Sequence, residues 1–158
     1  MKRLAVGAAV GVVVLLAAAQ AVPYGRGHVN PPARREPAWD SPRTRELVVR
    51  ACYDCHSNET VWPWYSRVAP LSWLIQRDVD AGRRKLNFSE WDRVQRDAWD
   101  SPTSVRKGEM PPWYYTVPQT PARMSAAERH ALAQGFEATL GTKRSRAGAG
   151  TGQGEANQ

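Results

Sequence analysis

The chain has 158 residues, of which 42% are hydrophobic and 23% are charged. That length favours one domain, and the composition is that of a globular chain, which excludes wholesale disorder. The 22 lysines and arginines exceed the 15 aspartates and glutamates and give a net charge of +7. Because the basic residues are interleaved with acidic ones and form no long block, we expect a solvated surface and no nucleic-acid partner.

The first 22 residues have the pattern of a targeting segment. Two cations at positions 2 and 3 precede an uninterrupted apolar run over residues 4–19, and residues 19–21 read A-Q-A, the small-x-small pattern of a signal peptidase site. The run is slightly long for a signal peptide and slightly short for a membrane span of about 20 residues. We expect either an anchor or a cleaved signal, and in both cases the rest of the chain crosses the membrane.

The remainder of the chain divides into a domain and a tail. Residues 23–40 are rich in proline and glycine and predict a loop. Residues 142–158 are rich in glycine and alanine without apolar periodicity, which predicts a disordered tail. We therefore expect a signal or anchor segment at residues 1–22, one domain at residues 23–141, and the tail after it.

Two helices are predicted in the first half of this domain. Ser41 is a suitable N-cap and Pro42 suits the first helical position, so a helix begins there and leads directly into Cys52. A second helix is expected over residues 71–81, with Gly82 ending it. No stretch of the chain has a convincing strand alternation.

The second half of the domain has further helix signals. Ser89 is placed to cap a third helix, and residues 101–108 predict a short helical turn before a proline-broken loop. Ser125 and Glu128 form a capping box at the start of the last helix, and Gly141 is a suitable stop. The prediction is a small all-α domain of three to five short helices with long loops.

The strongest chemical signal is the short motif at residues 52–56, which read C-Y-D-C-H. This is the C-x-x-C-H pattern of c-type haem attachment. Two thiols spaced in this way on a turn reach the two vinyl groups on one side of a porphyrin, and the adjacent His56 presents a nitrogen to the iron. The motif predicts one covalent haem, attached through Cys52 and Cys55, with His56 as an axial ligand.

Three other interpretations of the cysteine pair remain open. A thioredoxin-like redox motif needs a βαβ pattern, which is not evident here. A zinc site needs two more ligands, and the chain offers only His28, His56 and His130. A disulfide is compatible with export. Haem is favoured because both cysteines lie in the motif, the chain carries an export signal, and a helix leads into the motif.

Met110 is the leading candidate for the second axial ligand. It lies in residues 108–112, G-E-M-P-P, where the prolines stiffen the loop. A thioether is a soft ligand that favours reduced iron and raises the potential. The alternative is that Met110 fills a hydrophobic gap. Met124 is expected to pack beside a helix cap, and His28 and His130 are weaker candidates, with His130 expected at the surface.

The chain is rich in tryptophan, with seven against two phenylalanines. Tryptophan is large and suits a pocket around a flat, bulky group. The candidates for lining such a pocket are Trp62, Trp64, Trp73, Trp91, Trp113, Tyr114 and Tyr115. For any one of them, ordinary core packing is an equally good interpretation.

These motifs together resemble a class I cytochrome c, and more specifically the bacterial single-haem "haem-binding domain" family of cytochrome c-like proteins. The matching stretches are residues 22–26, 30–32, 52–65, 69–73, 86–91 and 108–115. The resemblance implies one covalent haem c with Cys52 and Cys55 as attachment residues, His56 as proximal ligand and Met110 as distal ligand. Members of the family usually keep an N-terminal membrane segment, which favours an anchor over cleavage near Ala21.

The expected function is that of a monohaem electron carrier, not an enzyme, on the outer side of a bacterial cytoplasmic membrane. His/Met ligation leaves no open position on the iron, which disfavours small-molecule catalysis. The expected partners are other membrane or extracytoplasmic redox proteins, the cytochrome c maturation machinery, and the membrane through the N-terminal helix. The alternatives are a haem-based sensor or enzyme with a displaceable distal ligand, and a zinc-binding or disulfide-bonded envelope module.

Overall fold

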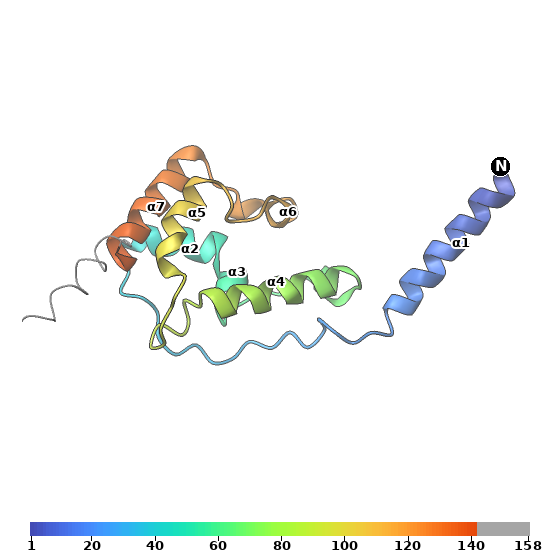
Figure 1. Ribbon diagram of the computed structural model, residues 1–158, viewed down its shortest axis with the longest axis horizontal. Coiled ribbons are helices and arrows are strands. Elements are labelled where there is room, and N and C mark those ends of the chain that lie inside the picture. Colours follow the sequence, from blue (N-terminus) through green and yellow to red (C-terminus); the bar gives the residue numbers. More distant parts are fainter. Residues whose placement is uncertain (142–158) are drawn as a thin grey trace, which may run out of the picture.

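The structure, a computed structural model, describes residues 1–141, and the expected tail at residues 142–158 lies outside the described part. Within the described part the regular elements are helical, apart from one isolated bridge between Arg35 and Glu90. The first helix, α1 (Lys2–Ala19), stands apart from the others (Figure 1). Its mean hydropathy of 1.9 and its length would allow it to cross a membrane, a property that N-terminal signal sequences share.

The helices that follow α1 form an all-α domain, and the predicted all-α fold class is confirmed. Its helices are α2 (Pro42–Ala51), α3 (Tyr53–His56), α4 (Leu71–Lys85), α5 (Ser101–Arg106), α6 (Trp113–Thr116) and α7 (Ala126–Leu140), with 3₁₀ turns at Trp64–Arg67, Ala98–Asp100 and Thr120–Ala122. The described part of this domain thus has six α-helices where three to five were expected. The difference comes from α3 and α6, which are single turns of four residues each.

The caps predicted from the sequence hold α2 and α7 in place. The Ser41 hydroxyl accepts a hydrogen bond from the Thr44 N–H at 3.2 Å at the start of α2. At the start of α7, the Ser125 hydroxyl accepts from the Glu128 N–H at 3.1 Å, and the Glu128 carboxylate accepts from the Ser125 N–H at 2.8 Å. Gly141 follows α7 with a φ of +77°, a backbone conformation that favours glycine.

Two helix predictions are wrong, and tertiary contacts explain both. Gly82 does not end α4 but lies inside it, where a Cβ atom would stand 2.2 Å from the carbonyl oxygen of Cys55. Ser89 does not cap a helix; its hydroxyl accepts the Asn58 N–H at 3.0 Å, and residues 91–97 are irregular. In both cases a small residue serves a contact with a distant part of the chain.

The core of the domain lies where α7 packs against α5 and α2 (Figure 1). Phe88 is at its centre, with its ring 6.0 Å from that of Phe136 and inclined to it by only 9°. Leu47 of α2 and Leu132 of α7 are fully buried beside this pair. This core fixes the position of α2, and therefore also that of Cys52, which lies between the end of α2 and the start of α3.

Candidate functional site

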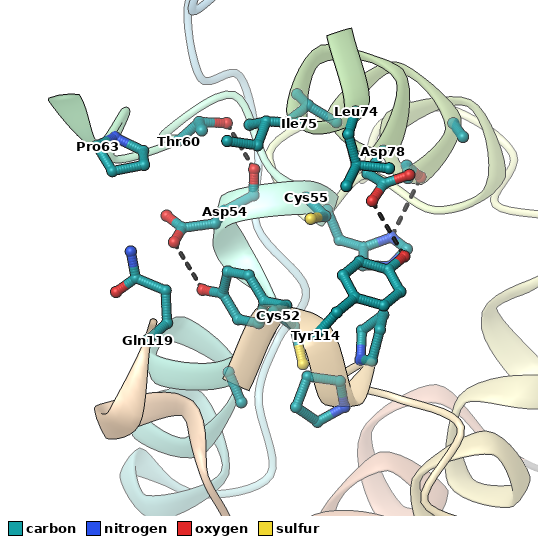
Figure 2. Close-up of a pocket in the computed structure, with 18 of the residues that line it drawn as sticks. Cys52, Asp54, Cys55, Thr60, Pro63, Leu74, Ile75, Asp78, Tyr114 and Gln119 are labelled. Carbon is teal, nitrogen blue, oxygen red and sulfur yellow. Dashed lines mark hydrogen bonds between the residues drawn. The ribbon is translucent and has the colours of Figure 1, made fainter. Parts of the chain in front are cut away.

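A cavity of about 340 Å³ lies between α4 and the segment of residues 110–119, and α3 forms part of its wall (Figure 2). Pockets for small molecules and cofactors have volumes of roughly 300–1,000 Å³. Cys52, Cys55, His56 and Met110 all line this cavity. The structure therefore brings the four predicted site residues, which span almost 60 positions of sequence, to one place.

The two thiols reach the cavity because the motif forms a single helical turn. The His56 N–H donates to the Cys52 carbonyl at 2.9 Å, and residues three apart on such a turn lie on one face. Both cysteines are free. Burial raises the pKa of each thiol to about 12, and for Cys55 the carboxylates of Asp54 and Asp78 add to this effect. At neutral pH the pair is therefore two uncharged thiols.

The imidazole of His56 is fixed in one tautomer. Its Nδ1 atom lies 3.0 Å from the Leu86 carbonyl oxygen and 3.1 Å from that of Gly82. Since carbonyl oxygens only accept hydrogen bonds, Nδ1 carries the proton and Nε2 keeps a free lone pair. Burial also lowers the pKa of His56, which favours the neutral ring. A neutral imidazole whose other nitrogen donates to a carbonyl is the usual state of a metal-ligating histidine.

Two tyrosines hold the opposite wall of the cavity against α3 and α4. The Tyr114 hydroxyl donates to the Asp78 carboxylate at 3.0 Å, and the Tyr115 hydroxyl donates to Asp54 at 2.6 Å (Figure 2). Burial raises the pKa of both phenols, so both remain hydrogen-bond donors at neutral pH. These bonds fix α6, and with it the loop that carries Met110.

Met110 differs from the other candidate ligands in its position. Its side chain is 38% exposed and lines the cavity. Met124 is buried in the core of the domain, as expected. His28 stacks on Trp62 at a ring distance of 4.5 Å, and His130 is exposed on α7. Of these candidates, Met110 alone is placed to contact a group in the cavity together with His56.

The aromatic lining differs from the prediction. The aromatic side chains that face the cavity are Tyr65, Tyr114 and Tyr115. The expectation was correct for Tyr114 and Tyr115, and wrong for the five tryptophans Trp62, Trp64, Trp73, Trp91 and Trp113, which do not line it. The lining also includes a stripe of α4 that the sequence analysis missed, namely Leu71, Leu74, Ile75, Asp78 and Val79. The helical spacing of these apolar residues in the sequence could have predicted that they share one face of α4.

The residues present fit a haem group. The lining is mostly aliphatic and tyrosine side chains, and it offers two thiols, a free imidazole nitrogen and a thioether, all of them groups that c-type haem proteins use. Within residues 1–141, no group of three or more His, Cys, Asp or Glu side chains is arranged to hold a metal ion.

An all-α domain with a C-x-x-C-H turn beside an apolar cavity is typical of a small haem protein. The chain matches the family model described as "Haem-binding domain" over residues 14–138. Because this match covers most of the chain, the protein belongs to the haem-binding domain family, and its cofactor is haem. No curated protein and no solved structure matches the chain.

Proposed function

We propose that the protein attaches one haem c covalently through Cys52 and Cys55 and carries single electrons on the outer side of a bacterial cytoplasmic membrane. One observation carries this proposal. Both thiols and the free nitrogen of a neutral His56 belong to a single turn at the wall of an apolar cavity.

Attachment requires only an addition reaction at each cysteine. The sulfur of Cys52 would form a bond to one carbon of a vinyl group while the thiol hydrogen would pass to the other carbon, and Cys55 would do the same with the second vinyl group. No oxidant is consumed. The thiols must be reduced and the haem delivered outside the cytoplasm, so we propose the cytochrome c maturation machinery as a partner.

The residues around the cavity control the iron. When bound, haem supplies an iron that alternates between the ferrous and ferric states. In the proposal His56 and Met110 would hold the iron, and the hydrogen bonds of His56 to the carbonyls of Gly82 and Leu86 orient its ring. The tyrosines and the aliphatic stripe of α4 limit the access of water. With both residues bound, no coordination position on the iron would stay open, which would favour electron transfer over catalysis.

A haem-based sensor or enzyme is the second candidate, and the exposure of Met110 favours it. A ligand that is 38% exposed is displaced more easily than a buried one. In that case a small molecule such as carbon monoxide would replace the thioether on ferrous iron.

The N-terminal helix α1 and the net charge of the chain support the proposed setting. Export through α1, as an anchor or a signal, places the haem domain outside the cytoplasm, where we propose membrane or extracytoplasmic redox proteins as partners. The net charge of +7 favours an acidic partner through steering, over a small and transient interface.

A spectroelectrochemical titration of the full chain, produced with the maturation machinery, tests the proposal. The expected result is one reversible transition with the slope of a single-electron couple, and a ferrous spectrum that carbon monoxide leaves unchanged. A carbon monoxide complex formed without denaturation would favour the sensor or enzyme. A protein that never acquires haem absorption would favour the zinc-binding or disulfide-bonded module.

A further inference from the structure

The connection between α1 and the domain is a specific joint rather than a free linker. Gln20 directly follows α1, and its Nε2 donates to the Ala69 carbonyl at 2.9 Å. Its Oε1 accepts the Ala69 N–H at 3.1 Å. Arg26 then donates to the backbone carbonyl of Gln20 and also, at 3.3 Å, to its side-chain oxygen. One side chain at the end of α1 thus pairs with both polar backbone groups of a residue in the domain.

The chain after this joint lies against the first turn of α4. Gly25 has a φ of +78°, and a Cβ atom there would stand 2.2 Å from the Ser72 carbonyl oxygen. No side chain fits in that space, so only glycine allows the segment to lie so close to α4. In Figure 1 the end of α1 and the beginning of α4 accordingly face each other.

Cleavage near Ala21 would damage the folded domain. Gln20 would leave with α1, and the N–H and carbonyl of Ala69, a residue only 2% exposed, would lose these partners. Unpaired buried backbone groups are costly and rare in native structures. The joint therefore indicates that Gln20 belongs to the mature protein, and with it α1.

Two segments with exposed tryptophan side chains border the cavity, residues 61–71 and residues 113–117, here called the two lips. Trp64 is 80% exposed in the first lip, and Trp113 is 77% exposed in the second. Each indole stands edge-on against a neighbouring tyrosine that lines the cavity, Trp64 against Tyr65 at 5.8 Å and Trp113 against Tyr114 at 5.9 Å. The exposed aliphatic side chains of the lips are Val61, Val68, Leu71 and Val117.

A basic side chain accompanies each lip. Arg67, in the first lip, is exposed. Arg123 is also exposed and donates to the backbone carbonyls of Thr116 and Val117 at the end of the second lip. Tryptophan is enriched in the headgroup region of a bilayer, and basic side chains bind the phosphates of the lipids there. The tryptophans and arginines at the lips are therefore compatible with this region.

We propose that α1 is retained as an anchor and that the Gln20–Ala69 joint holds the two lips, and so the mouth of the cavity, against the phospholipid headgroups of the bilayer that α1 spans. This inference rests on the membrane setting given under the proposed function. Lipid is the occupant because the joint fixes the lips at the end of the domain that faces α1 (Figure 1). The haem would then exchange electrons with molecules that arrive in the plane of the membrane.

Lipid photo-crosslinking of the full chain tests this arrangement. The matured protein is reconstituted in nanodiscs of phosphatidylethanolamine and phosphatidylglycerol that contain a phospholipid with a diazirine next to its headgroup. After illumination and trypsin digestion, Trp64 of the first lip is found in the peptide of residues 51–67, and the whole second lip is found in the peptide of residues 108–123. We expect lipid adducts on both peptides, and a several-fold loss of them in Gln20→Ala. The matched control Gln134→Ala, an exposed position on α7, should leave them unchanged.

The possible results separate the claims. Adducts confined to α1 would overturn the docking and leave the lips available to a soluble redox protein. Equal adducts in the wild type and in Gln20→Ala would overturn the role of the joint. A mature chain that begins at Val22 in the soluble fraction would overturn the retention of α1. Haem staining of the same samples tests covalent attachment separately, because adducts on a chain without haem would refute the proposed function and not the docking.

Discussion

The two halves of the domain differ in what fills them. In the core half, formed by α2, α5 and α7, aromatic and aliphatic side chains fill the interior, and Phe88 and Phe136 are 1% exposed or less. In the cavity half, formed by α3, α4 and residues 110–119, apolar side chains surround an open volume. The core half is therefore filled by the polypeptide itself, whereas the cavity half leaves room for a cofactor.

This difference has an energetic consequence. An apolar cavity forgoes packing contacts, and a ligand that binds only the folded state stabilises that state. We therefore expect substitutions in the core half to act on stability with or without haem. Substitutions in the cavity half should act first on haem attachment and on the spectrum of the iron.

The largest expected effect is that of removing both thiols. Cys52→Ser with Cys55→Ser should abolish covalent haem completely, because no nucleophile for the vinyl groups remains. Haem staining of a denaturing gel measures it. Each single substitution is the control and should keep haem through one thioether bond. Haem that remains bound to the double variant in the denaturing gel would contradict the proposed attachment.

A substitution in the core half should act on stability alone. Phe136→Ala should lower the free energy of unfolding by about 3–5 kcal/mol, since it empties the centre of the aromatic stack. Urea denaturation of the holoprotein measures this change. Val94→Ala, at an exposed position, should stay within about 0.5 kcal/mol of the wild type. A similar loss in both variants would show that the core does not lie where the structure places it.

Gly82→Ala should affect the cavity half. The added Cβ would stand 2.2 Å from the Cys55 carbonyl oxygen, so α4 must move away from α3. We expect a loss of about 1–3 kcal/mol in stability and a lower yield of attached haem. The matched control is Gly7→Ala in α1, where a new Cβ would meet nothing within 4 Å. Unchanged haem yield in Gly82→Ala would contradict the close packing of α3 on α4.

Met110→Ala should change the iron and not the attachment. Haem should remain covalently bound, while the absorption of the methionine–iron bond disappears, the reduction potential falls, and ferrous iron binds carbon monoxide. Absorption spectroscopy and a redox titration measure these changes. Met124→Leu, in the core half, should leave the spectrum unchanged. If Met124→Leu alone removed that absorption, Met124 would be the distal ligand.

The smallest expected effect is the pH dependence that Glu36 confers. Hydrogen bonds from the Arg45 guanidinium, both at 2.7 Å, lower the pKa of Glu36 to about 2 from an ordinary value near 4.5. The ionised carboxylate thus stabilises the folded state above pH 4.5, and this contribution is lost as the pH falls towards 2. Because the pair is largely exposed, we expect less than about 1 kcal/mol.

Denaturation of the wild type and of Glu36→Gln at pH 7 and pH 3 measures that contribution. The stability difference between the two proteins should shrink at pH 3. A difference that stays constant between the two pH values would mean that the ion pair does not form in solution.

The sequence predicted features that depend on neighbouring residues. The predicted helix caps at Ser41 and Ser125 are confirmed, because an N-cap hydrogen bond depends only on residues in the next turn of the chain. The C-x-x-C-H turn and the α2 helix that leads into it were predicted for the same reason. The proline-rich loop and the family resemblance predicted that Met110 belongs to the same site as this turn. In the structure Met110 does line the same cavity as the turn.

The sequence did not predict features that depend on distant partners. Gly82 has the pattern of a helix stop, but its role is the close approach of Cys55, 27 positions earlier in the chain. The sequence predicts Tyr114 as a lining residue, but its hydrogen bond to Asp78, which holds α6 in place, depends on the tertiary fold. The tryptophans were assigned to the pocket by size alone, whereas Trp64 and Trp113 lie at the surface.

The most direct test of the central claim is a pyridine haemochrome spectrum of the full chain, produced with the cytochrome c maturation machinery and extracted with acidic acetone. The account predicts that haem stays with the protein and shows the band position of a haem with two thioether bonds. Haem that passes into the acetone would contradict covalent attachment through Cys52 and Cys55.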